Sequence, residues 1–192
     1  MAITSRVTPE ASASMPSPSP IANAAALIGD RRWKRLTERG NEAYAQGDIP
    51  LAQAFYEDAL TEAGRLFEAA ISGEEILPVP VIYNISCHNL AELFERSGNR
   101  KEAEAYFRAA YDQLLQTAQS PATPIGLRVS CVQHLKHALA VLVQHLRSSG
   151  GPEDLIGDVI NRAHNTAYSI YRLAQHEMQA DAECPHCPIS LS

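Results

Sequence analysis

Residues 40–59 read GNEAYAQGDIPLAQAFYEDA, and this segment determines the architecture that we expect for the whole chain. Small and aromatic residues recur in it at three- and four-residue spacings, which is typical of one face of a helix. Gly47 and Asp48 interrupt the pattern, and Pro50 follows at a position that suits the first turn of a new helix. The segment therefore predicts two helices joined by a tight turn.

The same pattern returns twice towards the C-terminus. The second copy turns at Gly98 and the third at Gly151, so that the three turn glycines are spaced by 51 and 53 residues. A regular period is typical of stacked helical hairpins, because each hairpin alone leaves an apolar face in water. Residues 76–83 carry Pro78 and Pro80, which argue against a paired strand. We expect six principal helices in three antiparallel pairs.

Small and aromatic residues occupy matching places in the first two units. They are Gly40, Ala43, Tyr44, Gly47, Ala52, Tyr56 and Ala59, and then Ala91, Phe94, Gly98, Ala103, Phe107 and Ala110. This register resembles a tetratricopeptide repeat, in which small residues stand where helices cross and aromatic rings fill the gap beside them. The third unit keeps the register without the aromatic residues. The resemblance implies an all-α fold of three stacked antiparallel helix pairs in a right-handed superhelix.

Composition divides the chain into three parts. Residues 1–20 are rich in Pro, Ser and Ala and predict a disordered arm. Residues 21–179 form the predicted helical repeat domain, and residues 180–192 form a tail that contains cysteines. The period exceeds the roughly 34 residues of the family that the units resemble. We therefore expect longer second helices or longer loops between the repeats.

The overall charge and hydropathy exclude several classes of protein. The 192 residues carry 16 Lys and Arg against 22 Asp and Glu, a formal net charge of -6. Nucleic-acid binding needs a basic excess that is missing here. No apolar run approaches the roughly 18 residues of a membrane span, and no secretory signal is recognisable, so we expect a cytoplasmic protein. A glycine-rich phosphate loop, a carboxylate pair at a useful spacing and a nucleophile elbow are also missing, and we expect no enzyme.

The resemblance implies that the first helix of each pair lines a concave partner-binding face. We expect this face to carry Lys34, Asn41, Tyr44, Ile85, His88, Asn89, Glu92, His134, Val141 and His145. Asn41 and Asn89 occupy the places where clamp-type members of the family hold a peptide's terminal carboxylate. The clamp is incomplete, because Thr37, Ala138 and Leu142 stand where such members have basic residues. The predicted function is a non-enzymatic adaptor, co-chaperone-like, that binds an extended or C-terminal segment of another protein.

The charge pattern favours an acidic or C-terminal partner segment. No acidic residue occurs between Asp112 and Glu153, while three basic residues and three histidines do. This cationic stretch could steer such a segment to the third unit. A solvated helix with acidic neighbours on adjacent helices is the alternative interpretation. A homodimer is a further alternative, because a three-unit stack without a polar cap exposes an end face.

A metal-binding or metal-responsive protein is the alternative function. The tail contains Cys184, His186 and Cys187, three residues with nitrogen or sulfur ligands, and His176 could add a fourth for zinc. The histidines of the concave face do not predict a site, because His134 and His145 are about 16 Å apart along one helix. We expect no cofactor unless the tail binds zinc. Cys87 and Cys131 lie in helical patterns and are interpreted as packing residues.

Overall fold

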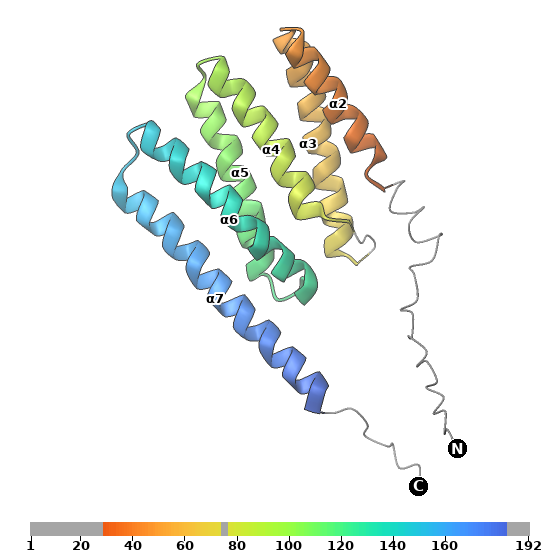
Figure 1. Cartoon of the computed structure of the whole chain (residues 1–192), viewed down its shortest axis with the longest axis vertical. Coiled ribbons are helices and arrows are strands. Elements are labelled where there is room, and N and C mark those ends of the chain that lie inside the picture. The colour runs from red at the N-terminus through yellow and green to blue at the C-terminus, as the bar shows by residue number, and fades with distance from the viewer. Residues whose placement is uncertain (1–28, 74–76, 184–192) are drawn as a thin grey trace, which may run out of the picture.

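The computed structural model describes residues 29–73 and 77–183, and every regular element in these ranges is an α-helix. The helices are α2 (Arg31–Ala45), α3 (Ile49–Ile71), α4 (Val79–Arg96), α5 (Arg100–Gln119), α6 (Ile125–Ser148) and α7 (Glu153–Glu183) (Figure 1). This confirms the all-α class, and the described residues contain no strand near Pro78 and Pro80. The predicted arm, residues 1–20, lies outside the described residues. The last helix continues four residues beyond the predicted domain end at residue 179.

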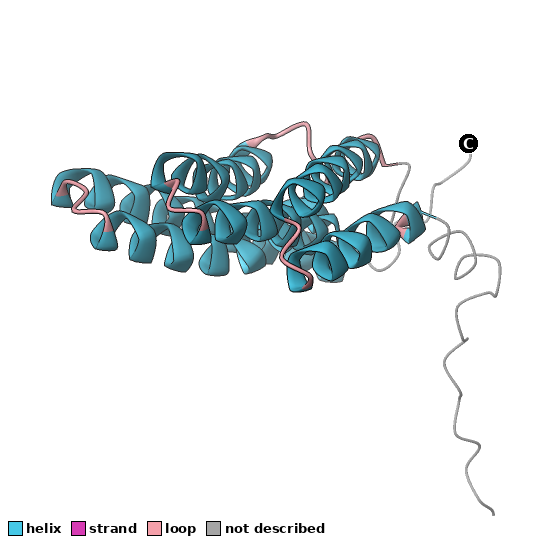
Figure 2. Cartoon of the chain, turned by 90° about the horizontal axis from the view of Figure 1, so that it is seen from above, coloured by secondary structure: helices cyan, strands magenta, loops and turns pink. Residues whose placement is uncertain are grey.

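The helices pack neighbour to neighbour along the chain, in two layers (Figures 1 and 2). In addition to these sequential contacts, α4 touches α6 and α5 touches α7. The first helices of the pairs therefore share one face of the molecule, and the second helices share the other. One apolar cluster passes through all six helices, from Trp33 in α2 to Ile170 in α7. The described residues thus share a continuous core, as stacking of hairpins requires.

The turn within each helix pair has the same backbone geometry. Gly47, Gly98 and Gly150 have φ values of +79°, +75° and +72°, which favour glycine because it lacks a Cβ. In each turn the residue after the glycine donates its N–H to the carbonyl five positions earlier, at 2.8–3.0 Å. The prediction of Gly151 as the third turn glycine was wrong by one residue. Gly151 is needed for another reason, because a Cβ there would lie 3.0 Å from the carbonyl oxygen of Leu146.

The alanines predicted at helix crossings are buried. Ala52, Ala59, Ala103 and Ala110 are at most 3% exposed. The aromatic residues expected beside them, Tyr56 and Phe107, are buried too. A larger side chain at such a crossing would force the two helices apart.

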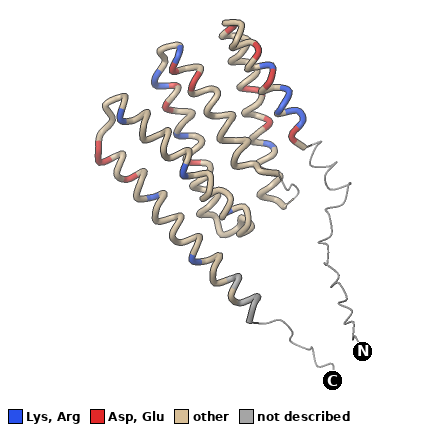
Figure 3. Tube along the Cα trace, viewed as in Figure 1, with Lys and Arg blue, Asp and Glu red and all other residues tan. Residues whose placement is uncertain are grey.

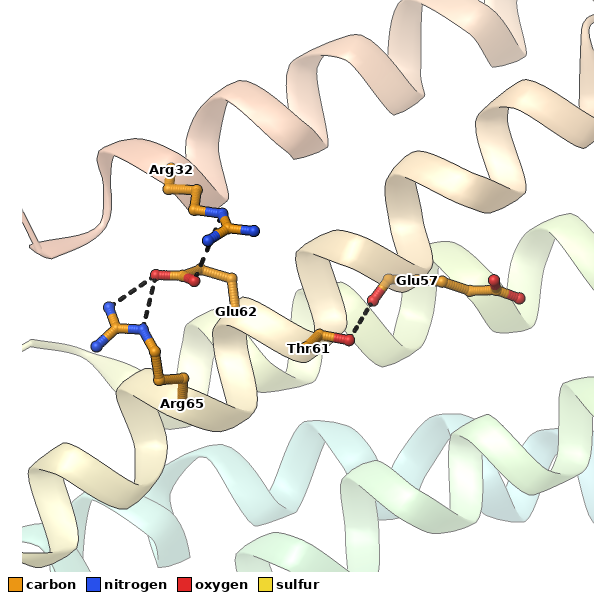
Figure 4. Close-up of polar contacts among 5 residues, drawn as sticks. All are labelled: Arg32, Glu57, Thr61, Glu62 and Arg65. Atoms are coloured by element: carbon orange, nitrogen blue, oxygen red, sulfur yellow. Dashed lines mark hydrogen bonds and ion pairs between the residues drawn. The ribbon is translucent and has the colours of Figure 1, made fainter.

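Polar contacts also join the elements of the stack. The indole Nε1 of Trp33 donates to the hydroxyl of Ser86 at 2.8 Å, which connects α2 to α4 across 53 residues of sequence. Between α2 and α3, the buried carboxylate of Glu62 accepts two hydrogen bonds from Arg65 and lies 3.7 Å from the guanidinium of Arg32 (Figure 4). This ion network satisfies a charge that burial would otherwise destabilise, and we interpret it as structural.

Candidate functional site

Three adjoining hollows follow the face formed by α2, α4 and α6. The first, of about 200 Å³, is lined by Asn41, Tyr44, Tyr56, Asn89 and Glu92. The second, of about 230 Å³, is lined by Val81, Asn84, Ile85, His88, Asn89, His134 and His137. The third, of about 160 Å³, is lined by His88, Glu95, Phe107, Val141, Gln144, His145 and Ser148. Because Asn89 and His88 are each shared by two hollows, the three form one row, which we call the groove.

The structure brings together the residues that the sequence predicts for the concave face, with one exception. Lys34 lines none of the three hollows; its ammonium group lies 2.8 Å from Asp30 Oδ2. Helical spacing from His134 also predicts that Ala138 lies on the concave face, but Ala138 is fully buried in the core. The reason is that α6 is apolar on several sides, so that spacing alone does not say which side packs inward.

The first hollow presents a fixed amide. The hydroxyl of Tyr56 donates to Asn41 Oδ1 at 2.8 Å, so the oxygen of this amide is occupied. Gly40 permits the arrangement, because a Cβ there would come within 2.5 Å of the Tyr56 ring. The amide nitrogen of Asn41 therefore remains as a donor at the hollow, where it could bind a carbonyl or a carboxylate oxygen.

A tyrosine hydroxyl in the first hollow is left without a partner. The Tyr44 hydroxyl is buried and forms no hydrogen bond within the described residues. Burial raises the pKa of Tyr44. The positive charge of Arg96, whose guanidinium lies 5.1 Å from the ring centroid, lowers this pKa by a smaller amount. Glu92, which also raises this pKa, lies 3.4 Å from Arg96. The hollow thus offers an uncharged donor beside an ion pair that is half exposed to solvent.

The second hollow combines an unpaired amide with imidazoles. Asn84 is 6% exposed, and its Oδ1 accepts no hydrogen bond from any described residue. The ring centroids of His88 and His137 are 5.7 Å apart, and the edge of His88 meets Phe107. Burial, followed by the charge of His137, lowers the pKa of His88, against smaller effects of Glu92 and Glu95. A buried acceptor without a donor is costly, so a ligand that donates to Asn84 would be stabilised.

The third hollow has a histidine as part of its wall. His145 is 3% exposed, and its Nδ1 lies 2.7 Å from Glu95 Oε1, so that it links α6 to α4. Its ring also lies against Phe107, with the centroids 5.2 Å apart. The sequence predicted that His145 contacts the partner directly. In the structure its ring supports the wall, and only part of it reaches the hollow.

Sequence reasoning missed eight of the seventeen residues that line the three hollows, and three of these matter most for the chemistry of the groove. Tyr56 was assigned to packing alone, and nothing in the spacing shows that its hydroxyl reaches Asn41. Asn84 and His137 could have been found, because Asn84 precedes His88 by four residues and His137 follows His134 by three. The set of groove-facing residues predicted for α4 and α6 was therefore too small.

The predicted tail ligands Cys184, His186 and Cys187 lie outside the described residues. Within the described residues, no group of three or more His, Cys, Asp or Glu side chains is arranged to hold a metal ion. Cys87 and Cys131 are fully buried, as the packing interpretation predicts. Burial raises the pKa of each thiol to about 12, which keeps both protonated at neutral pH.

Comparisons with known proteins identify the family of this chain. In the part of the chain that the structure describes, no helix is both long and apolar enough to cross a bilayer. Neither the curated proteins nor the solved structures contain a match. A family model described as "Protein of unknown function (DUF2753)" matches residues 31–179, which include α2 to α6 and most of α7. The chain therefore belongs to the DUF2753 family.

Proposed function

We propose that this protein is a non-enzymatic adaptor that binds a peptide segment of another protein in the groove. The observation that carries the proposal is the continuity of the three hollows, which lie on one face and share Asn89 and His88. A row of connected hollows suits an extended chain better than a compact small molecule. The finer architecture, a right-handed superhelix like that of tetratricopeptide repeats, belongs to the same proposal and is supported by the buried alanines at the crossings.

The groove offers groups that match a peptide main chain. Asn41 has a free amide nitrogen, and Asn84 has a free amide oxygen. A peptide main chain carries a donor and an acceptor in each of its peptide groups, so Asn41 in the first hollow and Asn84 in the second can each pair with one polar atom of a bound segment. Ile85, which is 39% exposed, and Val141 supply apolar contacts.

An acidic or C-terminal segment is the partner class that the charges favour. Helix α6 carries no Asp or Glu, whereas α2 to α5 carry both signs (Figure 3). Histidines from α4 and α6 surround the second hollow. A carboxylate in the second hollow would gain from hydrogen bonds with the imidazoles, and no Asp or Glu lines that hollow. Glu92 and Glu95 of α4 line the first and third hollows and would repel a carboxylate there.

The test is a selection of random 12-residue peptides against the purified protein, with free and with amidated C-termini. The double variant Asn41→Ala, Asn89→Ala should weaken binding of the selected peptides about tenfold or more, since two hydrogen bonds are lost. Asn161→Ala is the matched control, because Asn161 is exposed on α7 and lines none of the three hollows. Full binding by the double variant, with unchanged helicity by circular dichroism, would show that the groove is not the site.

A further inference from the structure

A hollow separate from the groove lies where α5, α6 and α7 meet. It has a volume of about 350 Å³ and is lined by Gln119, Arg128, Arg162, Asn165, Thr166, Ser169 and Ile170. It shares no lining residue with the groove. We propose that this hollow binds a phosphate group, either as free phosphate or as a phosphate monoester.

Two arginines from different helices reach this hollow. The Nε of Arg128 donates to the carbonyl of Ala118 at 2.9 Å, which fixes the guanidinium at the C-terminal end of α5. The terminal nitrogens of Arg128 have no acceptor within the described residues. Arg162 on α7 forms no ion pair with any described carboxylate, although Asp158 precedes it by one helical turn. Both guanidinium groups can therefore donate to a ligand.

Thr166 and Asn165 are also able to donate. The Thr166 hydroxyl accepts a hydrogen bond from Gln119 Nε2 at 2.7 Å, so its own hydrogen remains free. Thr166 is 6% exposed and lines the hollow together with Ile170, which is also buried. The hydroxyl hydrogen of Ser169 is already donated to the carbonyl of Asn165 at 2.9 Å, so Ser169 adds no donor. The side-chain amide of Asn165 forms no hydrogen bond with any described residue, so its N–H groups are available. No Asp or Glu lines the hollow.

The charge and shape of the donor set favour phosphate over carboxylate. A phosphate monoester carries about −1.5 to −2 charges at pH 7 and presents three acceptor oxygens. Two guanidinium groups match that charge, and Thr166 adds a neutral donor. A carboxylate carries one charge and is satisfied by one planar arginine fork, which would leave the second arginine unpaired.

A ligand in this hollow would contact three helices at once and would therefore affect how the last helix packs. Arg128 belongs to the first turns of α6, Gln119 is the last residue of α5, and Arg162 and Thr166 belong to α7. A phosphate bound between the two arginines would therefore bridge α6 and α7. Such a ligand stabilises the folded state by RT ln(1 + c/Kd), where c is its free concentration and Kd its dissociation constant.

The experiment uses the full chain and isothermal titration calorimetry at constant ionic strength, with inorganic phosphate and phenyl phosphate as probes and sodium chloride as the reference salt. We expect saturable binding of at least one phosphate probe. Arg162→Gln should weaken it about tenfold or more, because a charge-assisted hydrogen bond is lost. Arg172→Gln is the matched control: Arg172 lies on the same helix, contacts Tyr168 and does not line the hollow.

The two probes distinguish the sources of the phosphate group. Tighter binding of phenyl phosphate would indicate a monoester, and tighter binding of inorganic phosphate would indicate the free ion. Equal weakening by Arg162→Gln and Arg172→Gln would overturn the proposal, because it would show non-specific attraction to positive charge. Acetate is titrated in the same way as a carboxylate probe, and tighter binding of acetate than of either phosphate probe would also overturn the proposal. The groove proposal does not depend on the result, since the two sites share no residue.

Discussion

The ring of Tyr56 lies directly against the backbone of Gly40, so that a Cβ added there would come within 2.5 Å of Tyr56 Cε1. The same tyrosine holds the amide of Asn41 through its hydroxyl. A glycine inside α2 therefore permits both the packing of α2 on α3 and the orientation of a groove residue. The fold and the candidate site depend on one close contact.

Gly40→Ala should destabilise the protein. Alanine favours a helix over glycine by about 1 kcal/mol, but overpacking a buried ring costs roughly 1–3 kcal/mol. We expect a net loss of about 1 kcal/mol in the free energy of unfolding, measured by urea denaturation. Gly64→Ala is the control, because a Cβ at Gly64 meets nothing within 4 Å. That variant should gain stability, and a gain in both would contradict the close contact.

Ala103→Leu should destabilise the stack by roughly 1–3 kcal/mol, because Ala103 is 0% exposed in the core and has no room for three more carbons. Ala105→Leu is the matched control two residues away on α5, where the side chain is exposed. Thermal unfolding followed by circular dichroism compares them. Equal melting temperatures for the two variants would mean that the inferred register of α5 is wrong.

The helices could be predicted because the residues that begin and end each helix lie close to its ends in the sequence. Asp48 caps α3 by accepting from the N–H of Leu51, Pro50 occupies its first turn, and Gly47 ends α2. Each signal acts within a few residues and can be read without knowing the fold. The third turn was displaced by one residue because Gly150 and Gly151 are adjacent, and only the backbone shows which has positive φ.

The groove could be predicted only in outline. The resemblance to tetratricopeptide repeats implies that the outer faces of α2 and α4 line a groove, and helical spacing then finds Asn41, Tyr44 and Asn89 on these faces. It does not find that His145 is buried against Glu95, because that pair is 50 residues apart in sequence. Long-range pairs depend on how the helices stack, which no local pattern specifies.

Ser86→Ala should weaken the contact between α2 and α4. The variant leaves the indole N–H of Trp33 buried without its acceptor, which costs about 1–3 kcal/mol. Trp33 is the only tryptophan in the sequence, so its fluorescence reports this site alone. Ser97→Ala is the control, because the Ser97 hydroxyl bonds only to a carbonyl of its own helix. Identical emission spectra and unfolding midpoints in both variants would contradict a structural role for the bond.

The adaptor proposal predicts that the purified protein carries no stoichiometric zinc. Elemental analysis of the full chain and of a variant ending at Glu183 should give the same low metal content. The truncation removes Cys184, His186 and Cys187 but keeps all six helices described here. One zinc per chain, lost on truncation, would instead support the metal-binding alternative, since structural zinc uses Cys and His ligands.

Acidification should destabilise the protein through His88. Burial, and then His137, lowers the pKa of His88 in the folded state, while the unfolded value is about 6.5. Between these two values the unfolded chain binds more protons, so the free energy of unfolding rises with pH there and falls as the pH drops below about 6.5. Glu92 and Glu95 oppose the shift without reversing it. In urea denaturation at several pH values, His88→Gln should flatten this dependence, and His164→Gln, at an exposed position on α7, should not. An unchanged slope in the His88 variant would show that the pH dependence arises elsewhere.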